Sequence, residues 1–357
     1  MQLAREHKAQ VCWILLIAAS LLNVVLLGCG SNGTPTPPPA PLGHAYVVAS
    51  STTYGYSIAA SDGALQVLDV SAGLPGVGKS VTSNGQDVYV LNGSGQITAY
   101  QINSDFTLSQ LANSPFSGAP SGVAFVAIDP AGKNLFVPVP GDSAVLPYAI
   151  DATTGNLTVG VETATPAPPL TATVDFQDRF LYVPMDSGGT QLFQLSGDVL
   201  TSVKTIPPLA SGKSEFVAIT PNNQFAYIAD GVSGIAAYSV NQTTGDLTPI
   251  VGTPYGTLTG PSTLAITPNG KYIYVANAAG ISSFTINSDG TLTGNQGLVA
   301  LGNPATELAV DVTGTYLYGV VVQTNLISVF HIDSSGKLAA QPAVPVASTP
   351  NSIVLIQ

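Results

Sequence analysis

Residues Gly260–Thr293 read GPSTLAITPNGKYIYVANAAGISSFTINSDGTLT and contain four short stretches typical of β-strands. Leu264–Ile266 is apolar and ends at a Pro-Asn-Gly turn, Tyr272–Ala276 and Ile281–Ile286 alternate, and a Ser-Asp-Gly turn leads into Leu292. Alternating runs joined by tight turns predict one antiparallel sheet of about 35 residues. A lone sheet of this size cannot bury both faces, so we expect other parts of the chain to supply copies that stack against it.

The rest of the chain repeats this unit. An aromatic residue of the predicted second strand recurs at spacings of 43, 47, 46, 45, 47 and 44 residues. Its seven occurrences are Tyr46, Tyr89, Phe136, Tyr182, Tyr227, Tyr274 and Tyr318. Aliphatic residues flank each one with a period of two, so both faces of the strand should be buried between stacked sheets.

Two further features of the repeat indicate a radial arrangement. The predicted first strands carry a small residue at Ala127, Ala218, Ala265 and Ala309, which we attribute to crowding at the centre. The domain opens at His44–Val48 with a second strand, and the chain stops at Asn351–Ile356 with a first strand. The last strand should therefore complete the first unit and leave no open edge.

These features predict an all-β protein with a seven-bladed β-propeller of four-stranded antiparallel blades over residues 44–357, about 45 residues per blade. A β-helix or another solenoid is the alternative, but solenoids need atypical capping repeats, whereas these ends complement each other. The composition agrees, since 37 residues are Gly, 27 are Pro and only 8% are charged. The net charge is −11 and no Lys/Arg cluster occurs, so binding to nucleic acid is not expected.

The first 43 residues contain a predicted targeting segment. Arg5 and Lys8 precede an apolar run over residues 11–27, as in a secretion signal, and the run ends at Leu-Leu-Gly-Cys29. This end resembles the lipobox of bacterial lipoproteins, which implies a signal peptide over residues 1–28 and a lipid on Cys29. An uncleaved transmembrane anchor is the alternative, although 17 residues that include Asn23 are short for a bilayer span.

Residues 29–43 are predicted to form the lipidated cysteine and a Pro-rich, extended linker. The chain has two cysteines, Cys12 in the signal and Cys29, so no disulfide is expected in the domain. We expect a cell-envelope protein held at a membrane by lipid, at the outer membrane or on the periplasmic or extracellular face, and monomeric.

The blades resemble the lactonase family of seven-bladed propellers, the group of 6-phosphogluconolactonase-type and YncE-type proteins. The resemblance is carried by Thr267–Asn277, by Ile281–Ile286 and by the similar stretch Asp129–Pro138. These motifs build blades, so they imply architecture rather than chemistry. Where relatives carry Arg and His before a first strand, this chain has Gly260–Thr263 and Pro120–Ala124, without either residue.

The candidate catalytic residues are few. Glu215 and Glu307 stand at the starts of predicted first strands, where blades present loops to the channel mouth. The alternative readings are a surface pair between Lys213 and Glu215, and a turn capped by Glu307. His331 is the third candidate, although a mid-strand histidine is more often structural.

Other residues give no support for a cofactor or a metal site. Asp175 and Arg179 flank a turn and are expected to pair there, and no acid-rich loop has calcium-ligand spacing. Calcium ligands drawn from separate blades would not be visible in the sequence. Two functions remain open: a scaffold that binds a carbohydrate or a protein at the channel mouth, and a lactone hydrolase, which would be a carboxylic ester hydrolase.

Overall fold

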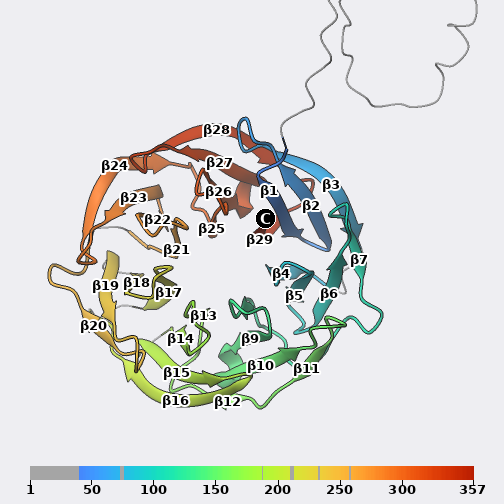
Figure 1. The fold of residues 1–357 in the computed structure, drawn as a ribbon, viewed down its shortest axis with the longest axis horizontal. Helices are drawn as coiled ribbons and strands as arrows, with labels where there is room; N and C mark the ends of the chain where they lie inside the picture. The colour runs from blue at the N-terminus through green and yellow to red at the C-terminus, as the bar shows by residue number, and fades with distance from the viewer. Residues whose placement is uncertain (1–39, 73–75, 187, 210–212, 232–233, 257–258) are drawn as a thin grey trace, which may run out of the picture. The chain divides into compact units, whose positions relative to one another are not determined.

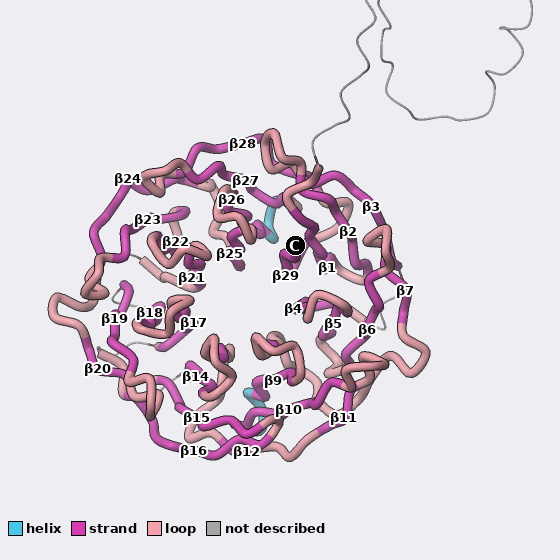
Figure 2. Tube along the Cα trace, viewed as in Figure 1, coloured by secondary structure: helices cyan, strands magenta, loops and turns pink. Residues whose placement is uncertain are grey.

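The computed structural model describes residues 40–357, apart from 73–75, 187, 210–212, 232–233 and 257–258. The chain divides into Met1–Pro39 and Ala40–Gln357, and the first unit lies outside the described residues. The predicted signal peptide, Cys29 and most of the linker fall in that unit. The second unit consists of seven antiparallel sheets set around a common centre, as Figures 1 and 2 show.

Each sheet is one blade, and its four main strands follow one another from the centre outward. Blade 1 comprises β29 (Pro350–Ile356), β1 (Gly43–Ala49), β2 (Thr52–Ile58) and β3 (Leu65–Ala72). Blade 2 comprises β4 (Gly78–Ser83), β5 (Asp87–Asn92), β6 (Ile97–Ile102) and β7 (Leu108–Gln110). Blade 3 comprises β8 (Ala127–Ile128), β9 (Asn134–Val139), β10 (Ala144–Ile150) and β11 (Leu157–Val159), with β12 (Thr163–Ala164) also paired to β10.

The remaining four blades follow in chain order. Blade 4 comprises β13 (Thr173–Val174), β14 (Phe180–Pro184), β15 (Thr190–Ser196) and β16 (Val199–Ile206). Blade 5 comprises β17 (Ser214–Ile219), β18 (Phe225–Asp230), β19 (Gly234–Val240) and β20 (Leu247–Pro249). Blade 6 comprises β21 (Thr263–Ile266), β22 (Tyr272–Asn277), β23 (Gly280–Ile286) and β24 (Leu292–Ala300). Blade 7 comprises β25 (Glu307–Val310), β26 (Tyr316–Val321), β27 (Leu326–Ile332) and β28 (Leu338–Pro345). Two single-turn 3₁₀ helices, η1 (Pro140–Asp142) and η2 (Val322–Thr324), follow β9 and β26.

The two ends of the propeller join as predicted. The last strand, β29, pairs antiparallel with β1, and Val354 lies opposite Tyr46. Because the C-terminal strand is the innermost strand of blade 1, this blade has four strands like its neighbours, and β1 is paired on both sides. The predicted seven-bladed propeller with closure by the C-terminal strand is therefore confirmed.

The aromatic column holds neighbouring blades together. All seven of its members are fully buried. Six are tyrosines, and each donates its hydroxyl hydrogen to a backbone carbonyl in the turn between the third and fourth strands of the next blade. The acceptors are Phe106, Gly155, Gly245, Gly290, Gly336 and Gly63, at 2.7–3.1 Å. The seventh member is Phe136, which has no hydroxyl, so the junction between blades 3 and 4 lacks this bond.

The small residues of the inner strands have a more specific reason than central crowding. Ala127, Ala218, Ala265 and Ala309 each pair directly with a member of the aromatic column on the second strand. A small side chain there leaves room for the ring beside it. The predicted small residues are therefore present, but packing against the ring on the neighbouring strand explains them as well as crowding at the centre does.

Two strand boundaries differ from the prediction. The predicted first strand that carries Ala127 is reduced to Ala127–Ile128, because the backbone N–H of Val126 donates to the hydroxyl of Ser80 in blade 2 at 3.3 Å. At the other end, β1 begins at Gly43, and the Leu42 N–H already donates to the carbonyl of Ile58. The end of the predicted linker is therefore part of blade 1.

Candidate functional site

A cavity of about 470 Å³ lies at the inner strands of the ring. Its walls come from β4, β8, β13, β25 and β29, so it belongs to the central channel rather than to a single blade. Hydroxyl-bearing residues of β4 and the ring of Phe125 both line it. A mixed wall of this kind suits a small molecule that has both hydroxyl groups and apolar faces.

Glu307 is the acidic side chain at the blade 7 wall of this cavity. Its Oε2 accepts a hydrogen bond from the Ile353 N–H of the closing strand at 3.2 Å. Burial raises the pKa of Glu307 to about 7, although hydrogen bonds from Ser352 and Ile353 partly oppose the shift. At neutral pH this carboxyl group can therefore accept or release a proton.

Glu307 does not cap a turn, so that alternative is wrong. The hydroxyl oxygen of Ser352 accepts a hydrogen bond from the Val81 N–H of blade 2 at 3.1 Å. Ser352 thus connects the Glu307 carboxyl group of blade 7, through blade 1, to blade 2. This network fixes the carboxyl group against the channel wall, at the border of the cavity.

Glu215 stands at the start of β17 in blade 5 and does not line the cavity. Its Oε1 lies 2.9 Å from where a Cβ at Gly231 would be, which indicates close packing on the loop after β18. Burial raises its pKa, Lys213 opposes that shift, and Asp186 and Asp230 add to it. The expected Lys213–Glu215 pair is corrected, because the Lys213 ammonium forms its ion pair with Asp186.

The two histidines of the domain lie away from the cavity. His331 is on β27, the third strand of blade 7, with its ring edge-on to Tyr316 at 5.6 Å between centroids. His44 is 6% exposed and its ring stacks on Phe106 at 3.4 Å, where burial lowers its pKa. Of the three candidate residues, only Glu307 reaches the cavity.

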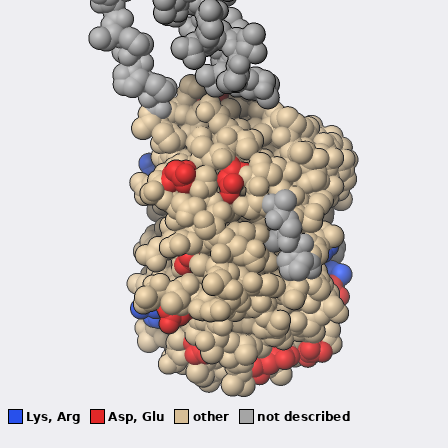
Figure 3. Space-filling model, turned by 90° about the vertical axis from the view of Figure 1, so that its right-hand side faces the viewer, with Lys and Arg blue, Asp and Glu red and all other residues tan. Residues whose placement is uncertain are grey.

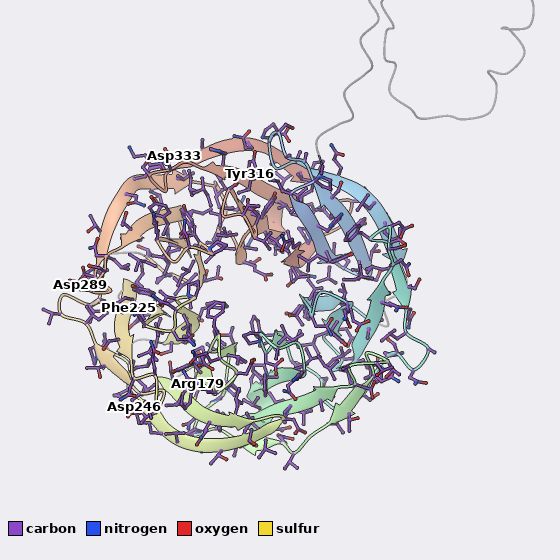
Figure 4. All side chains as sticks on the ribbon, in the orientation of Figure 1. Arg179, Phe225, Asp246, Asp289, Tyr316 and Asp333 are labelled. Atoms are coloured by element: carbon purple, nitrogen blue, oxygen red, sulfur yellow. The ribbon has the colours of Figure 1, made fainter. Side chains whose placement is uncertain are left out.

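Asp175 and Arg179 pair as predicted. The guanidinium Nη2 lies 3.2 Å from Oδ2 of Asp175, whose Oδ1 accepts the backbone N–H groups of Arg179 and Phe180. Arg179 also donates to the carbonyl of Gln242 in blade 5. The pair therefore holds a turn and a blade junction and is not part of the cavity; Figure 4 labels Arg179.

Two polar residues of the inner wall were not predicted from the sequence. Thr82 and Thr173 pair with Tyr89 and Tyr182, at the positions where four other blades have alanine, and both line the cavity. The available signal was this departure from alanine, but it becomes visible only when every inner strand is aligned by its pairing.

The described residues contain no group of three or more His, Cys, Asp or Glu side chains that could hold a metal ion. They also include no helix with the length and hydrophobicity that a membrane span requires. On the side of the propeller seen in Figure 3, acidic side chains are scattered and few basic ones are visible.

Comparisons with known proteins agree with the fold. Residues 226–352 match the family model described as "Lactonase, 7-bladed beta-propeller". The 6-phosphogluconolactonase of Yersinia pestis (strain Pestoides F) is 27% identical over 71% of this chain and 79% of its own length. The 6-phosphogluconolactonase of Serratia proteamaculans is 24% identical over 71% of this chain and 80% of its own.

A solved structure shows the same architecture. The periplasmic gluconolactonase of Pseudomonas aeruginosa superimposes with a TM-score of 0.72 at 16% identity, covering 88% of this chain and 99% of that one. At this identity the likeness shows the fold alone. The blade motifs, the family model and the seven closed blades together identify this chain as a lactonase-like seven-bladed β-propeller.

Proposed function

We propose that this protein hydrolyses a small, neutral lactone, such as a sugar lactone, in its central channel. The observation that carries the proposal is the Glu307 carboxyl group, which borders a cavity of about 470 Å³ and has a pKa of about 7. The similarity to 6-phosphogluconolactonases supports the reaction type. A carboxylate that titrates near neutrality is suited to general base catalysis.

In the proposed reaction, ionised Glu307 takes a proton from a water molecule while the water oxygen attacks the lactone carbonyl carbon. The tetrahedral intermediate then collapses, the bond between the carbonyl carbon and the ring oxygen breaks, and protonated Glu307 returns the proton to that oxygen. The product is the open hydroxy acid. Ser80 and Thr82 of blade 2 line the same cavity and provide hydroxyl groups that can bind the hydroxyl groups of a sugar.

The charge of the cavity favours a neutral substrate over a phosphorylated one. No Lys or Arg is among the described residues that line it, whereas Glu307 and Asp129 are. A phosphate group would meet carboxyl groups without a cation to pair with. This is the main chemical difference that we expect between this protein and its 6-phosphogluconolactonase relatives.

The test is hydrolysis of δ-gluconolactone and of its 6-phospho form by the purified propeller, corrected for spontaneous opening. We expect turnover of the neutral lactone, a rate that rises with pH until about 7, and a loss of at least about 100-fold in Glu307→Gln. Glu215→Gln is the matched control and should keep the activity. Full activity in Glu307→Gln would show that this carboxyl group is not the base.

A ligand-binding scaffold is the second candidate. It is favoured by the absence of His, Arg and Lys from the described cavity lining, which leaves no cationic group to stabilise the oxyanion. In this case the channel would bind a carbohydrate and release it unchanged. Calorimetric binding of the reduced sugar, together with no turnover of any lactone, would favour the scaffold over the hydrolase.

We also propose that the protein is anchored in the cell envelope by a lipid on Cys29, as its Leu-Leu-Gly-Cys sequence suggests. Metabolic labelling with an alkyne fatty acid should mark the full chain and not Cys29→Ser. An unlabelled wild-type protein that stays in the membrane fraction would favour an uncleaved anchor.

A further inference from the structure

Most blade junctions share one packing device beside the tyrosine bonds. The residue two positions before the aromatic column is a Phe or Tyr in four blades, and its ring covers a glycine of the next blade's outer turn. These pairs are Phe180 with Gly245, Phe225 with Gly290, Tyr272 with Gly336, and Tyr316 with Gly63. A Cβ on any of these glycines would lie 2.3–2.7 Å from ring atoms, so the contact is tight. Figure 4 labels Phe225 and Tyr316.

The junction between blades 2 and 3 departs from this device. Asp87 occupies the ring position, two residues before Tyr89, and its Oδ2 lies 2.8 Å from where a Cβ at Gly155 would be. A carboxyl group is much smaller than a phenyl ring. The junction contains a cavity of about 450 Å³, which Asp87, Gly155, Gln86 and Gln101 help to line.

The Asp87 carboxyl group is buried without a cation. It is 7% exposed, and no Lys, Arg or His is among the described residues that line the cavity. The carboxyl group has two neutral hydrogen-bond partners, Asn84 and the Tyr89 hydroxyl, which lies 3.5 Å from Oδ2 and also donates to the Gly155 carbonyl at 3.0 Å. Since a buried carboxylate without a charged partner is unfavourable, the site is suited to a ligand that brings positive charge.

We propose that this cavity, which we call the Asp87 site, binds a small flat cation that carries a guanidinium or amidinium group. The flat face would pack in the polar pocket beside the turn Ala152–Gly155, where four other junctions place a ring. The N–H groups would donate to the Asp87 carboxylate in the paired geometry that guanidinium groups favour. This site is distinct from the channel cavity, since the two share no lining residue.

The shape and the charge of the Asp87 site together favour a flat cation over other classes of ligand. An anion would be repelled by Asp87, and a neutral sugar would leave the buried charge unpaired. An alkyl ammonium carries the charge but no flat group. A guanidinium could come from a free small molecule or from an arginine side chain of a peptide, and the experiment separates these sources.

The test is calorimetric or NMR titration of the propeller with benzamidine and, in parallel, with N-acetyl-arginine amide. We expect saturable binding of benzamidine, at least tenfold weaker binding of benzyl alcohol, and at least a tenfold loss in Asp87→Asn. If N-acetyl-arginine amide binds as tightly as benzamidine, the natural ligand is an arginine side chain of a peptide. If only benzamidine binds, the natural ligand is a free small molecule. Both results support the site.

Two variants make the test decisive. Asp87→Phe should fill the cavity with a ring, as at the four junctions where a Phe or Tyr covers the glycine. It should abolish binding while the β-sheet circular dichroism is retained. Asp289→Asn is the matched control, because it changes an exposed acid in the blade 6 turn where Phe225 already covers Gly290. Equal binding by wild type and Asp87→Asn, or no saturable binding by wild type, would overturn the proposal.

Discussion

Two blade junctions, between blades 5 and 6 and between blades 2 and 3, share the same tyrosine hydrogen bond but differ in how their interior is filled. In both, a buried tyrosine hydroxyl donates to a glycine carbonyl of the next blade at 3.0 Å. In the first, the Phe225 ring covers Gly290; in the second, the Asp87 carboxyl group lies over Gly155 beside a polar cavity. One side chain in a repeat therefore decides whether a junction is packed or open.

This difference separates structural from functional sites in a propeller. The shared tyrosine bonds keep the blades in register, so a position next to them can change without loss of the ring. The same holds at the axis, where most inner strands place alanine opposite the aromatic column but β4 and β13 place threonine. Departures from the repeat mark where ligands are expected to bind.

The largest effect is expected from Gly290→Ala. The new Cβ would lie 2.4 Å from the Phe225 ring, and the residue has a φ of 81°, so we expect a loss of roughly 3 kcal/mol in the free energy of unfolding. Gly197→Ala is the matched control, because this glycine has a φ of 64° at the same turn of blade 4, and beyond its chain neighbours no atom lies within 4 Å of where a Cβ would be. It should cost about 1–2 kcal/mol. Equal losses in urea unfolding would show that the ring contact is not tight.

A smaller effect is expected from Tyr274→Phe. The change removes the hydrogen bond to the Gly336 carbonyl, 3.1 Å long, at a side chain that is fully buried. We expect a loss of about 1–2 kcal/mol, since the buried carbonyl is left without this donor. Tyr255→Phe is the control, because its hydroxyl bond to the Val251 carbonyl is exposed. If both variants melt at the same temperature, the tyrosine bonds do not hold the junctions.

The smallest effect is expected from Asp87→Asn, and it depends on pH. Burial raises the pKa of Asp87 in the folded protein, with hydrogen bonds from Asn84 and Tyr89 opposing the shift. Because the folded state then holds its proton more tightly, wild type should lose stability as pH rises through the raised pKa. Asp87→Asn should lack this loss, so the two proteins should converge below the ordinary pKa of 3.8. A constant difference in unfolding free energy between pH 3 and 7 would contradict the shift.

The fold could be predicted from the sequence because its information is local and repeated. Alternation with a period of two fixes the strands, turns such as Ser288–Gly290 fix their connections, and the aromatic column fixes the number of blades. The complementary ends, His44–Val48 and Asn351–Ile356, fixed the closure. Where a contact came from another blade, the prediction failed: β8 is short because Ser80 takes the Val126 N–H.

The candidate site was predictable only in part. Glu307 could be placed near the channel because it begins a first strand, but its pKa depends on burial beside β29, 46 residues later in the chain. The same limit applies to Lys213, which stands two residues from Glu215 but pairs with Asp186 of another blade. Where blades meet side by side, the ion pair of a residue can therefore form with another blade rather than with a nearby residue in the sequence.

The sequence by itself determined seven sheets, their closure into a ring and the buried aromatic column, because alternation and turn chemistry act over a few residues. Only the tertiary structure decided which carboxyl groups are buried without a cation. Asp87 lies over Gly155, 68 residues away, and Glu307 faces a cavity walled by five strands. Burial and pKa arise from the surfaces that separate blades bring together, and no local pattern encodes them.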